Sequence, residues 1–329
     1  MKTEIQKRYR RKLTPPGMRF QSRDGEIIQA LHKYDGVLAR RQIKSLFWKS
    51  ASIKTMERRL TLLYHNGFLN LPTLDQRRRN PIPEPIVWMG WRGVLYASRQ
   101  LGIDVDDPLS NNENQLRKLE KMLRSLDIHW QREPRWSQLG HDIAVNDFRF
   151  AIERAAVKWP SVTLENWIPE GNFLREMDTI EFEYKDRNGK LIKRRKGVRP
   201  DGYFVLLDHL RQINNSPARA RFLLEFDNGT HPLTRFGKDK AIPGAEYVRS
   251  RAYKQRFGFN SGRWLVVCNG EQRMRNLKAQ TEKSAGAKAS VFLFTTMGQI
   301  KAETVLNMPI WMRGGSNKVM SLVNTIEVR

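Results

Sequence analysis

The sequence predicts an α+β protein of two parts: a small helical unit closed by a hairpin, then a larger α/β unit built on a mixed sheet. Three observations predict this. The first hundred residues space their apolar side chains as amphipathic helices do. The second half alternates helical patterns with short apolar runs bounded by Gly, Pro and Asn. A chain of 329 residues with 40% hydrophobic content also has enough material for two cores.

Residues 1–23 predict a flexible basic arm. They carry eight basic side chains and one acidic side chain, and Pro15-Pro16-Gly17 interrupts any regular structure. Such a segment serves either as a solubility tail or as an arm that follows DNA, and the composition alone does not separate the two.

Residues 24–110 predict three helices followed by a two-stranded hairpin. Asp24 is placed to cap the first helix, and Ala39 to Phe47 form the second. The third helix runs from Ser52 to about His65, with one apolar stripe. Strands at 68–71 and 86–89 then pair around a basic tip. This order is typical of a winged helix-turn-helix, whose third helix enters the major groove of DNA while the hairpin tip reaches phosphates.

The polar face of the third helix and the hairpin tip supply the expected DNA contacts. The groove contacts are Lys54, Thr55, Arg58 and Arg59, and the wing contacts are Arg77, Arg78 and Arg79. The alternative is a winged helix that pairs with protein, in which case these charges are only solvated.

Further elements follow in order. A helix at 91–101 completes the first unit, and an amphipathic helix at 111–126 lies in a linker of residues 111–135, where it packs on a neighbouring domain or on a second copy. The second domain spans 136–310, and residues 311–329 are expected to be a tail. The predicted elements of the second domain are helices at 141–158, 234–257 and 271–283, a charged hairpin insertion at 171–198, and strands at 162–168, 201–207, 221–227, 263–268 and 290–294.

The charge of the chain predicts an anionic partner. Lys and Arg number 59 against 34 Asp and Glu, which gives a net charge of +25. Nucleic acid is the leading candidate for such a surface. The single cysteine, Cys268, excludes an internal disulfide and ends an apolar run, so we expect a buried thiol. No apolar run is long enough to span a membrane, and we expect a cytoplasmic, nucleoid-associated protein.

Three carboxylates interrupt otherwise apolar strands. Asp201 opens one strand, and Glu225 and Asp227 are two apart on another, so those two point to the same face. Carboxylates that converge at a sheet edge repel each other unless a cation lies among them. Oxygen ligands of this kind suit Mg²⁺ or Mn²⁺, which activate water for phosphodiester hydrolysis. The alternative is that each carboxylate pairs with a nearby arginine such as Arg199.

These motifs together resemble the bacterial replication-relaxation family. The resemblance rests on Pro200-Asp201-Gly202 and Glu225-Phe226-Asp227-Asn228-Gly229-Thr230, preceded by His141, Asn146-Asp147 and Trp167-Ile168-Pro169-Glu170. It covers about residues 24–300. The family is associated with plasmids and other mobile elements and typically places a winged helix before a domain of the PD-(D/E)XK nuclease superfamily.

The resemblance implies roles for particular residues. Asp201 would be the first metal-binding carboxylate and Glu225 the second, with Glu170 as an extra ligand. The position that usually holds a lysine is Asp227, which departs from the pattern. We therefore expect the lysine from the following helix, either Lys238 or Lys240, to stabilise charge on the phosphate.

Three functions remain open at the level of sequence. The first is a Mg²⁺-dependent DNA endonuclease or nickase directed by its winged helix to double-stranded DNA of a mobile element. The second is a non-catalytic DNA-binding factor in plasmid replication, relaxation or transfer. The third is a transcriptional regulator. The expected protein partner is either a second copy of the chain, in a homodimer, or another protein of the mobile element.

Overall fold

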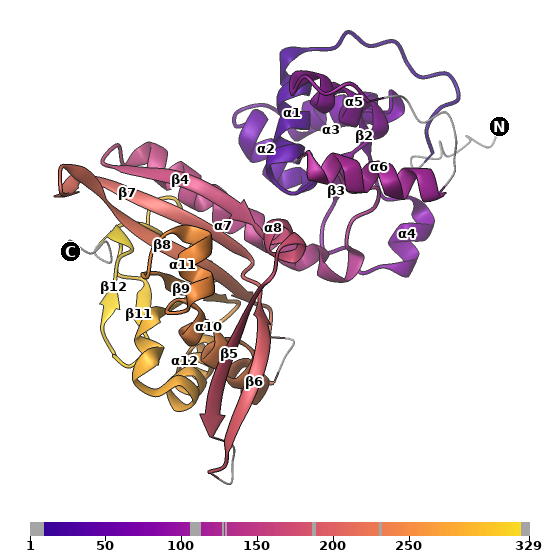
Figure 1. The fold of residues 1–329 in the computed structure, drawn as a ribbon. Helices are drawn as coiled ribbons and strands as arrows, with labels where there is room; N and C mark the ends of the chain where they lie inside the picture. The colour runs from indigo at the N-terminus through magenta and orange to yellow at the C-terminus, as the bar shows by residue number, and fades with distance from the viewer. Residues whose placement is uncertain are drawn as a thin grey trace. The chain divides into compact units, whose positions relative to one another are not determined.

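The computed structural model describes residues 10–105, 113–126, 128, 130–185, 189–229 and 232–323. The chain divides into two compact units, Met1–Asn146 and Asp147–Arg329, called here unit 1 and unit 2 (Figure 1). Each unit has its own sheet and its own core. In the described part of the chain, no helix is sufficiently long and apolar to cross a bilayer.

Unit 1 consists of helices around a small antiparallel sheet of three strands, in the order β1-β3-β2. The hairpin expected between 68–71 and 86–89 is present, with Leu69 opposite Met89. Strand β1 has no counterpart in the prediction. The elements are α1 (Ser22–Lys33), β1 (Val37–Ala39), α2 (Arg40–Phe47), α3 (Ile53–His65), β2 (Leu69–Asn70), α4 (Leu74–Arg79), β3 (Ile86–Met89), α5 (Trp91–Gln100) and α6 (Glu113–Ser125).

The start of α1 differs from the prediction in one respect. Asp24 is not the residue before the helix but lies in its first turn, where its Oδ2 accepts a hydrogen bond from the backbone N–H of Gln21 at 2.8 Å. Its side chain is completely buried, which is tolerated because the carboxylate is hydrogen-bonded and paired. In α3, by contrast, the Ser52 hydroxyl caps the helix as expected, accepting from the N–H of Lys54 at 3.2 Å.

The arm expected at 1–23 is anchored over its described part, which begins at residue 10. The guanidinium of Arg11 donates to the carbonyl oxygens of Tyr64 at 2.9 Å and Leu69 at 2.8 Å. The Phe20 ring lies 5.0 Å from that of Phe68, centroid to centroid. These contacts hold the segment against α3 and β2.

The main sheet of unit 2 has seven strands in the order β12-β11-β10-β9-β8-β7-β4. Strands β4, β7 and β8 pair antiparallel, β8, β9 and β10 pair parallel, and β10, β11 and β12 pair antiparallel. The sheet is therefore mixed, and the predicted fold class is confirmed. Its strands are β4 (Val162–Pro169), β7 (Gly202–Ile213), β8 (Ser216–Asp227), β9 (Arg263–Cys268), β10 (Phe292–Thr296), β11 (Trp311–Arg313) and β12 (Val319–Met320).

Helices cover both faces of this sheet (Figure 1). On one face Phe148 of α7 (Leu139–Lys158) packs against Phe204 and Trp311, with ring centroids 6.0 and 6.4 Å away. On the other face, Leu223 and Val266 join a buried apolar cluster with the helical layer. That layer contains α9 (Leu233–Phe236), the π-helical turn η2 (Gly237–Ala241), α10 (Ile242–Tyr247), α11 (Arg251–Phe257) and α12 (Glu271–Ala285).

The predicted charged insertion is a two-stranded hairpin beside the helical layer (Figure 1). Its strands are β5 (Asp178–Lys185) and β6 (Leu191–Val198), and it follows a short helix, α8 (Glu170–Arg175). The Asp178 carboxylate ties it to the helices, accepting from Arg256 Nε at 2.6 Å and from the hydroxyl of Tyr247. The segment expected as a tail supplies β11 and β12 of the main sheet. The domain boundaries at 110, 135 and 310 stay predictions.

Candidate functional site

The carboxylates that the sequence singles out lie at one end of strands β4, β7 and β8, and this end of the strands is called here the sheet edge. Asp201 immediately precedes β7, and Glu225 lies near the end of β8. Because Gly202 is opposite Leu224, Asp201 faces Glu225 across the two strands. Pro169 is opposite Gly202 on the other side, which brings Glu170 to the same edge. This register explains how residues spaced far apart in the sequence meet.

Asp201 and Glu225 are both buried, and different groups hold their charges. One Asp201 oxygen, Oδ2, accepts a hydrogen bond of 2.6 Å from the backbone N–H of Phe226. Glu225 Oε2 accepts from the ammonium of Lys240 at 2.7 Å. Only 6% of Asp201 and 8% of Glu225 is exposed, so both charges depend on such partners.

Lys240 is the lysine that reaches the carboxylates. Burial lowers its pKa, but the charges of Glu225 and Asp201 and the hydrogen bond to Glu225 outweigh that effect and raise the pKa above its usual value. The side chain is therefore a cation at neutral pH. Lys238, the alternative, is exposed on the same turn, and the structure does not place it at the carboxylates.

Asp227 departs from the predicted metal site. Its carboxylate is bound by both sides of the Arg273 guanidinium, with Nε at 2.7 Å from Oδ2 and Nη2 at 3.0 Å from Oδ1. The hydrogen bond to Asp227 raises the pKa of Arg273. A bidentate pair of this kind occupies both oxygens, so Asp227 orients α12 against β8. Burial, with the charge of Asp227, also raises the pKa of Cys268 to about 12, as befits the buried thiol expected there.

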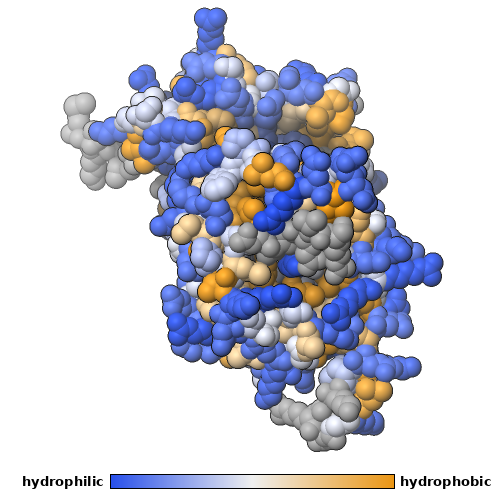
Figure 2. Space-filling view, turned by 90° about the vertical axis from the view of Figure 1, so that its left-hand side faces the viewer, coloured by the Kyte–Doolittle hydropathy of each residue, from blue (hydrophilic) through white to orange (hydrophobic). Residues whose placement is uncertain are grey.

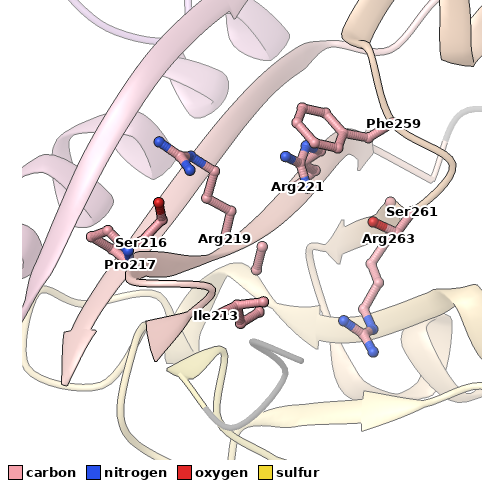
Figure 3. A pocket seen from close by; sticks show the side chains of 10 residues that line it. Ile213, Ser216, Pro217, Arg219, Arg221, Phe259, Ser261 and Arg263 are labelled. Atoms are coloured by element: carbon pink, nitrogen blue, oxygen red, sulfur yellow. The ribbon is translucent and has the colours of Figure 1, made fainter. Parts of the chain in front are cut away.

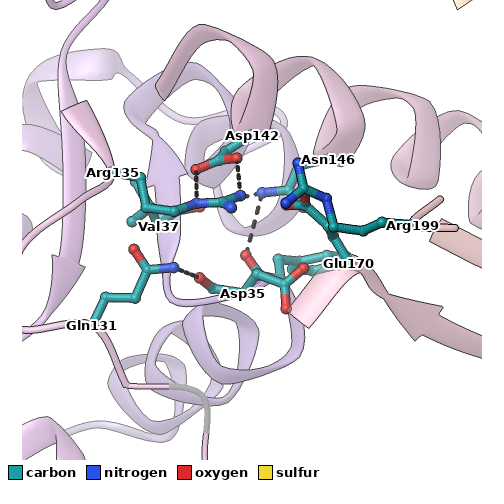
Figure 4. Close-up of polar contacts among 9 residues, drawn as sticks. Asp35, Val37, Gln131, Arg135, Asp142, Asn146, Glu170 and Arg199 are labelled. Atoms are coloured by element: carbon teal, nitrogen blue, oxygen red, sulfur yellow. Dashed lines mark hydrogen bonds and ion pairs between the residues drawn. The ribbon is translucent and has the colours of Figure 1, made fainter. Parts of the chain in front are cut away.

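Glu170 is also paired. The Arg199 Nε lies 3.2 Å from its Oε1 (Figure 4). Within the described ranges, no group of three or more His, Cys, Asp or Glu side chains is close enough to hold a metal ion. The four-carboxylate site expected from Asp201, Glu225, Asp227 and Glu170 is thus not formed, because arginines neutralise two of its members.

The remaining donor set still fits a hard cation. Mg²⁺ keeps several waters and is commonly bound through one or two carboxylates together with substrate phosphate oxygens. Asp201 and Glu225 face each other across β7 and β8, and each is a carboxylate with two oxygens. These two residues therefore fit Mg²⁺ or Mn²⁺, with Lys240 beside them.

In unit 1 the predicted DNA contacts separate into two groups. Lys54, Thr55 and Arg58 are exposed on α3, as the prediction requires. Arg59 is not: its Nε donates to Asp24 Oδ1 at 2.7 Å and its Nη2 contacts both Asp24 Oδ2 and the carbonyl oxygen of Arg19. The hydrogen bond to Asp24 raises the pKa of Arg59. This arginine holds α3 to α1, and its assignment as a groove contact is corrected.

The hairpin tip is a short helix rather than a loop. Thr73 caps α4, accepting from the N–H of Gln76 at 3.2 Å. Arg78 and Arg79 are exposed on it, and Arg77 is half-buried. The basic residues of the tip therefore lie on a helix and not in a loop.

Asn146, part of the family pattern, is buried and structural. Its amide donates to the carbonyl oxygens of Tyr34 and Val37, each at 3.2 Å (Figure 4). This side chain joins α7 to the turn between α1 and β1. Arg199 was among the arginines that the sequence offered as carboxylate partners, but no local pattern marks Arg273 as the partner of Asp227.

Comparison with known proteins assigns the chain to a family. A family model described as replication-relaxation matches residues 30–261. The chain belongs to the replication-relaxation family. Membership links it to the replication and relaxation of DNA. No curated protein matches it.

Two solved structures are similar to parts of this family member. The restriction endonuclease FokI bound to DNA has a TM-score of 0.24 and 12% identity, covering 84% of this chain and 43% of that one. A second FokI structure has a TM-score of 0.20 and 10% identity, covering 80% and 40%. The chain thus spans less than half the length of the FokI chains.

Proposed function

We propose that this replication-relaxation protein is a Mg²⁺-dependent endonuclease or nickase that acts on DNA of a plasmid or another mobile element. One observation carries the proposal: Asp201 and Glu225 face each other on adjacent strands while Lys240 lies 2.7 Å from Glu225. Two carboxylates and a lysine at one sheet edge form a site for phosphodiester hydrolysis.

Each residue of the site has a separable role. Asp201 and Glu225 would hold a divalent ion, which when bound polarises the phosphate and lowers the pKa of an attacking water. The hydrogen bond from the Phe226 N–H fixes Asp201. Lys240 keeps its proton because its pKa is raised, so its ammonium can stabilise negative charge that develops on the phosphate. Arg273 and Asp227 hold α12 in place.

Unit 1 would deliver the DNA. We propose that it is a winged helix-turn-helix, with α3 entering the major groove through Lys54, Thr55 and Arg58. Arg78 and Arg79, with Arg77 behind them, would contact phosphates from α4. The helix order and the antiparallel β2–β3 hairpin support this assignment. Pairing with a second copy or with other mobile-element proteins stays a prediction.

A nicking assay tests the enzymatic proposal. Supercoiled plasmid is incubated with the full chain and Mg²⁺ or Mn²⁺, and open-circle and linear products are measured. Asp201→Asn, Glu225→Gln and Lys240→Met should each reduce the rate at least 100-fold, because each removes a ligand or a positive charge used in the transition state.

Lys238→Met is the matched control, since it removes the same charge from an exposed position two residues away. Nicking that survives Glu225→Gln, or that falls equally in both lysine variants, would contradict the site.

A second candidate function has its own support. Lys240 already neutralises Glu225, and Arg273 neutralises Asp227, so the edge is stable without an ion. This pairing favours a DNA-binding factor in replication, relaxation or transfer whose nuclease-like unit is a binding platform. Wild-type protein that binds plasmid DNA but never nicks it, with either metal, would favour this function.

A further inference from the structure

A pocket of about 250 Å³ lies in unit 2, at the ends of β8 and β9 that are remote from the carboxylates. Arg219, Arg221 and Arg263 line it, together with Phe259 from the loop before β9 (Figure 3). Glu225 lies at the opposite end of β8. The pocket is therefore a separate site from the one proposed above.

Arg221 is the unusual residue of this pocket. Only 8% of it is exposed, and its guanidinium carbon lies 3.3 Å from the centroid of the Phe259 ring. Burial lowers the pKa of Arg221, and no carboxylate of the described chain forms an ion pair with it. Arg59 and Arg273 differ, because a bound carboxylate raises the pKa of each. A buried cation that pairs with no carboxylate of the described residues is stabilised further by an incoming anion.

The surroundings favour an anion of a particular kind. The Nε of Arg219 lies 3.4 Å from the Oε2 of Glu165. This ion pair is long and exposed to solvent, so it neutralises Arg219 only weakly. A second pocket, of about 220 Å³, shares Ser261 and Arg263 and adds Arg249 and Arg313. Among the described lining residues of the two pockets, none is acidic. The region therefore offers several guanidinium groups, which suit phosphates.

Phe259 supplies the other half of the recognition. Phe259 is 47% exposed although its side chain is large and apolar, and the Arg221 guanidinium lies against its ring. An exposed aromatic ring among arginines is how proteins bind bases that are out of the duplex, because every base has a face that stacks. The volume lies below the range of drug-sized ligand pockets, which suits a single base.

We propose that this pocket binds an unpaired nucleotide of single-stranded DNA, with the base on Phe259 and the flanking phosphates beside Arg219 and Arg263. This role depends neither on cleavage nor on duplex binding by α3. It gives unit 2 a means to hold a displaced strand while unit 1 holds duplex.

Photocrosslinking tests the contact directly. The full chain is mixed with a short oligothymidylate in which one base is replaced by iodouracil, which crosslinks to stacked aromatic rings. Trypsin cleaves after Arg256 and Arg263, so Phe259 is released within the peptide 257–263. We expect the crosslink in that peptide. Crosslinks confined to peptides outside 213–263 would overturn the proposal.

Binding measurements with variants provide the second test. Phe259→Leu keeps apolar bulk but removes the stacking face, and it should weaken oligothymidylate binding about tenfold, measured by fluorescence anisotropy. Binding to a duplex of equal length should not change. Trp159→Leu is the matched control, since Trp159 is an exposed aromatic residue of unit 2 that does not line the pocket. It should bind as wild type does.

Two outcomes would count against the nucleotide. Wild-type oligothymidylate affinity in Phe259→Leu would exclude stacking on this ring. Displacement of oligothymidylate by an acidic peptide, but not by thymidine monophosphate, would assign the pocket to a protein partner instead.

Arg58→Ala should give the reverse pattern to Phe259→Leu, with weaker duplex binding and unchanged single-strand binding. If Arg58→Ala binds duplex as tightly as wild type does, the proposed role of α3 is contradicted, and the proposal for the pocket is unaffected.

Discussion

Two adjacent arginines of α3 have opposite environments. Arg58 is exposed, whereas Arg59 is largely buried and binds Asp24, whose side chain has no exposed surface. A helix turns by about 100° per residue, so neighbouring positions need not share a face. Sequence spacing identified the charged face of α3 correctly at Arg58 and misassigned Arg59. Asp24, the buried carboxylate that binds Arg59, lies 35 residues earlier in the sequence.

This difference predicts a separation of stability from binding. Arg59→Met should lower the free energy of unfolding by about 3 kcal/mol, because it leaves the Asp24 charge buried without its partner. Arg58→Met should change that free energy by less than about 0.5 kcal/mol and weaken duplex binding instead. Urea unfolding and anisotropy measure the two quantities. Comparable destabilisation by both variants would contradict the buried pair.

The site residues could be predicted only in part. Asp201 and Glu225 stood out because charged side chains interrupt apolar strands. The choice between Lys238 and Lys240 was open, since the π-helical turn that carries them has no sequence signal that fixes its rotation. Arg273 could not be assigned to Asp227, because the pair is 46 residues apart and depends on how α12 packs.

At the scale of elements, η2 and the β5–β6 hairpin are joined by one carboxylate. Asp239 of η2 pairs with Arg194 at 3.0 Å and with Lys196 at 3.2 Å, both on β6. Gly237 begins the turn where α12 is very close, since a Cβ there would lie 2.4 Å from the Ser284 hydroxyl oxygen. The turn that carries Lys240 is thus fixed from two sides.

The Asp239 contacts predict a pH dependence. Burial raises the pKa of this carboxyl, but the hydrogen bond and charge of Lys196 and the charge of Arg194 outweigh burial and lower the pKa below its usual value of 3.8. The stabilisation is therefore present above pH 3.8 and is lost as the pH falls through the lowered folded pKa. Thermal unfolding should show Asp239→Asn less stable than wild type at pH 6, and the difference should shrink towards pH 3. A constant difference would contradict this account.

Elements with strong periodicity were predictable, whereas three of the shortest strands were not. The long helix α7 and the strands β4, β8 and β9 appear where the apolar patterns place them. The missed elements β1, β11 and β12 have two or three residues each, too few to show alternation. Strands β7 and β8 extend beyond their predicted ends because Asn214 and Asn215 both adopt positive φ, at 50° and 61°, in the connecting turn.

At the scale of the whole molecule, the chain carries a net charge of +25, and hydrophilic side chains are widespread on the face drawn in Figure 2. Exposed arginines remain on α3 and α4 and near the Phe259 pocket. The composition predicted this basic character correctly. It could not predict that the cations divide into structural ones, such as Arg273, and those available for a polyanion.

Duplex binding by the full chain should therefore depend steeply on salt. With about six phosphate contacts, affinity should fall about 1,000-fold between 50 and 200 mM salt, because counterions released from DNA drive association. Anisotropy titrations across that range measure the slope of log affinity against log salt. An affinity that hardly changes with salt would exclude phosphate contact as the main source of binding.

The separate origins of Glu225 and Lys240 have a consequence for how the chain tolerates change. The two side chains meet although one belongs to a strand and the other to a π-helical turn 15 positions later. Their meeting depends on the length of the intervening backbone as much as on their chemistry. Insertions or deletions between these positions should thus disconnect the lysine from the acid even when every named side chain is retained, so relatives that vary in length here would have to recruit their cation from elsewhere.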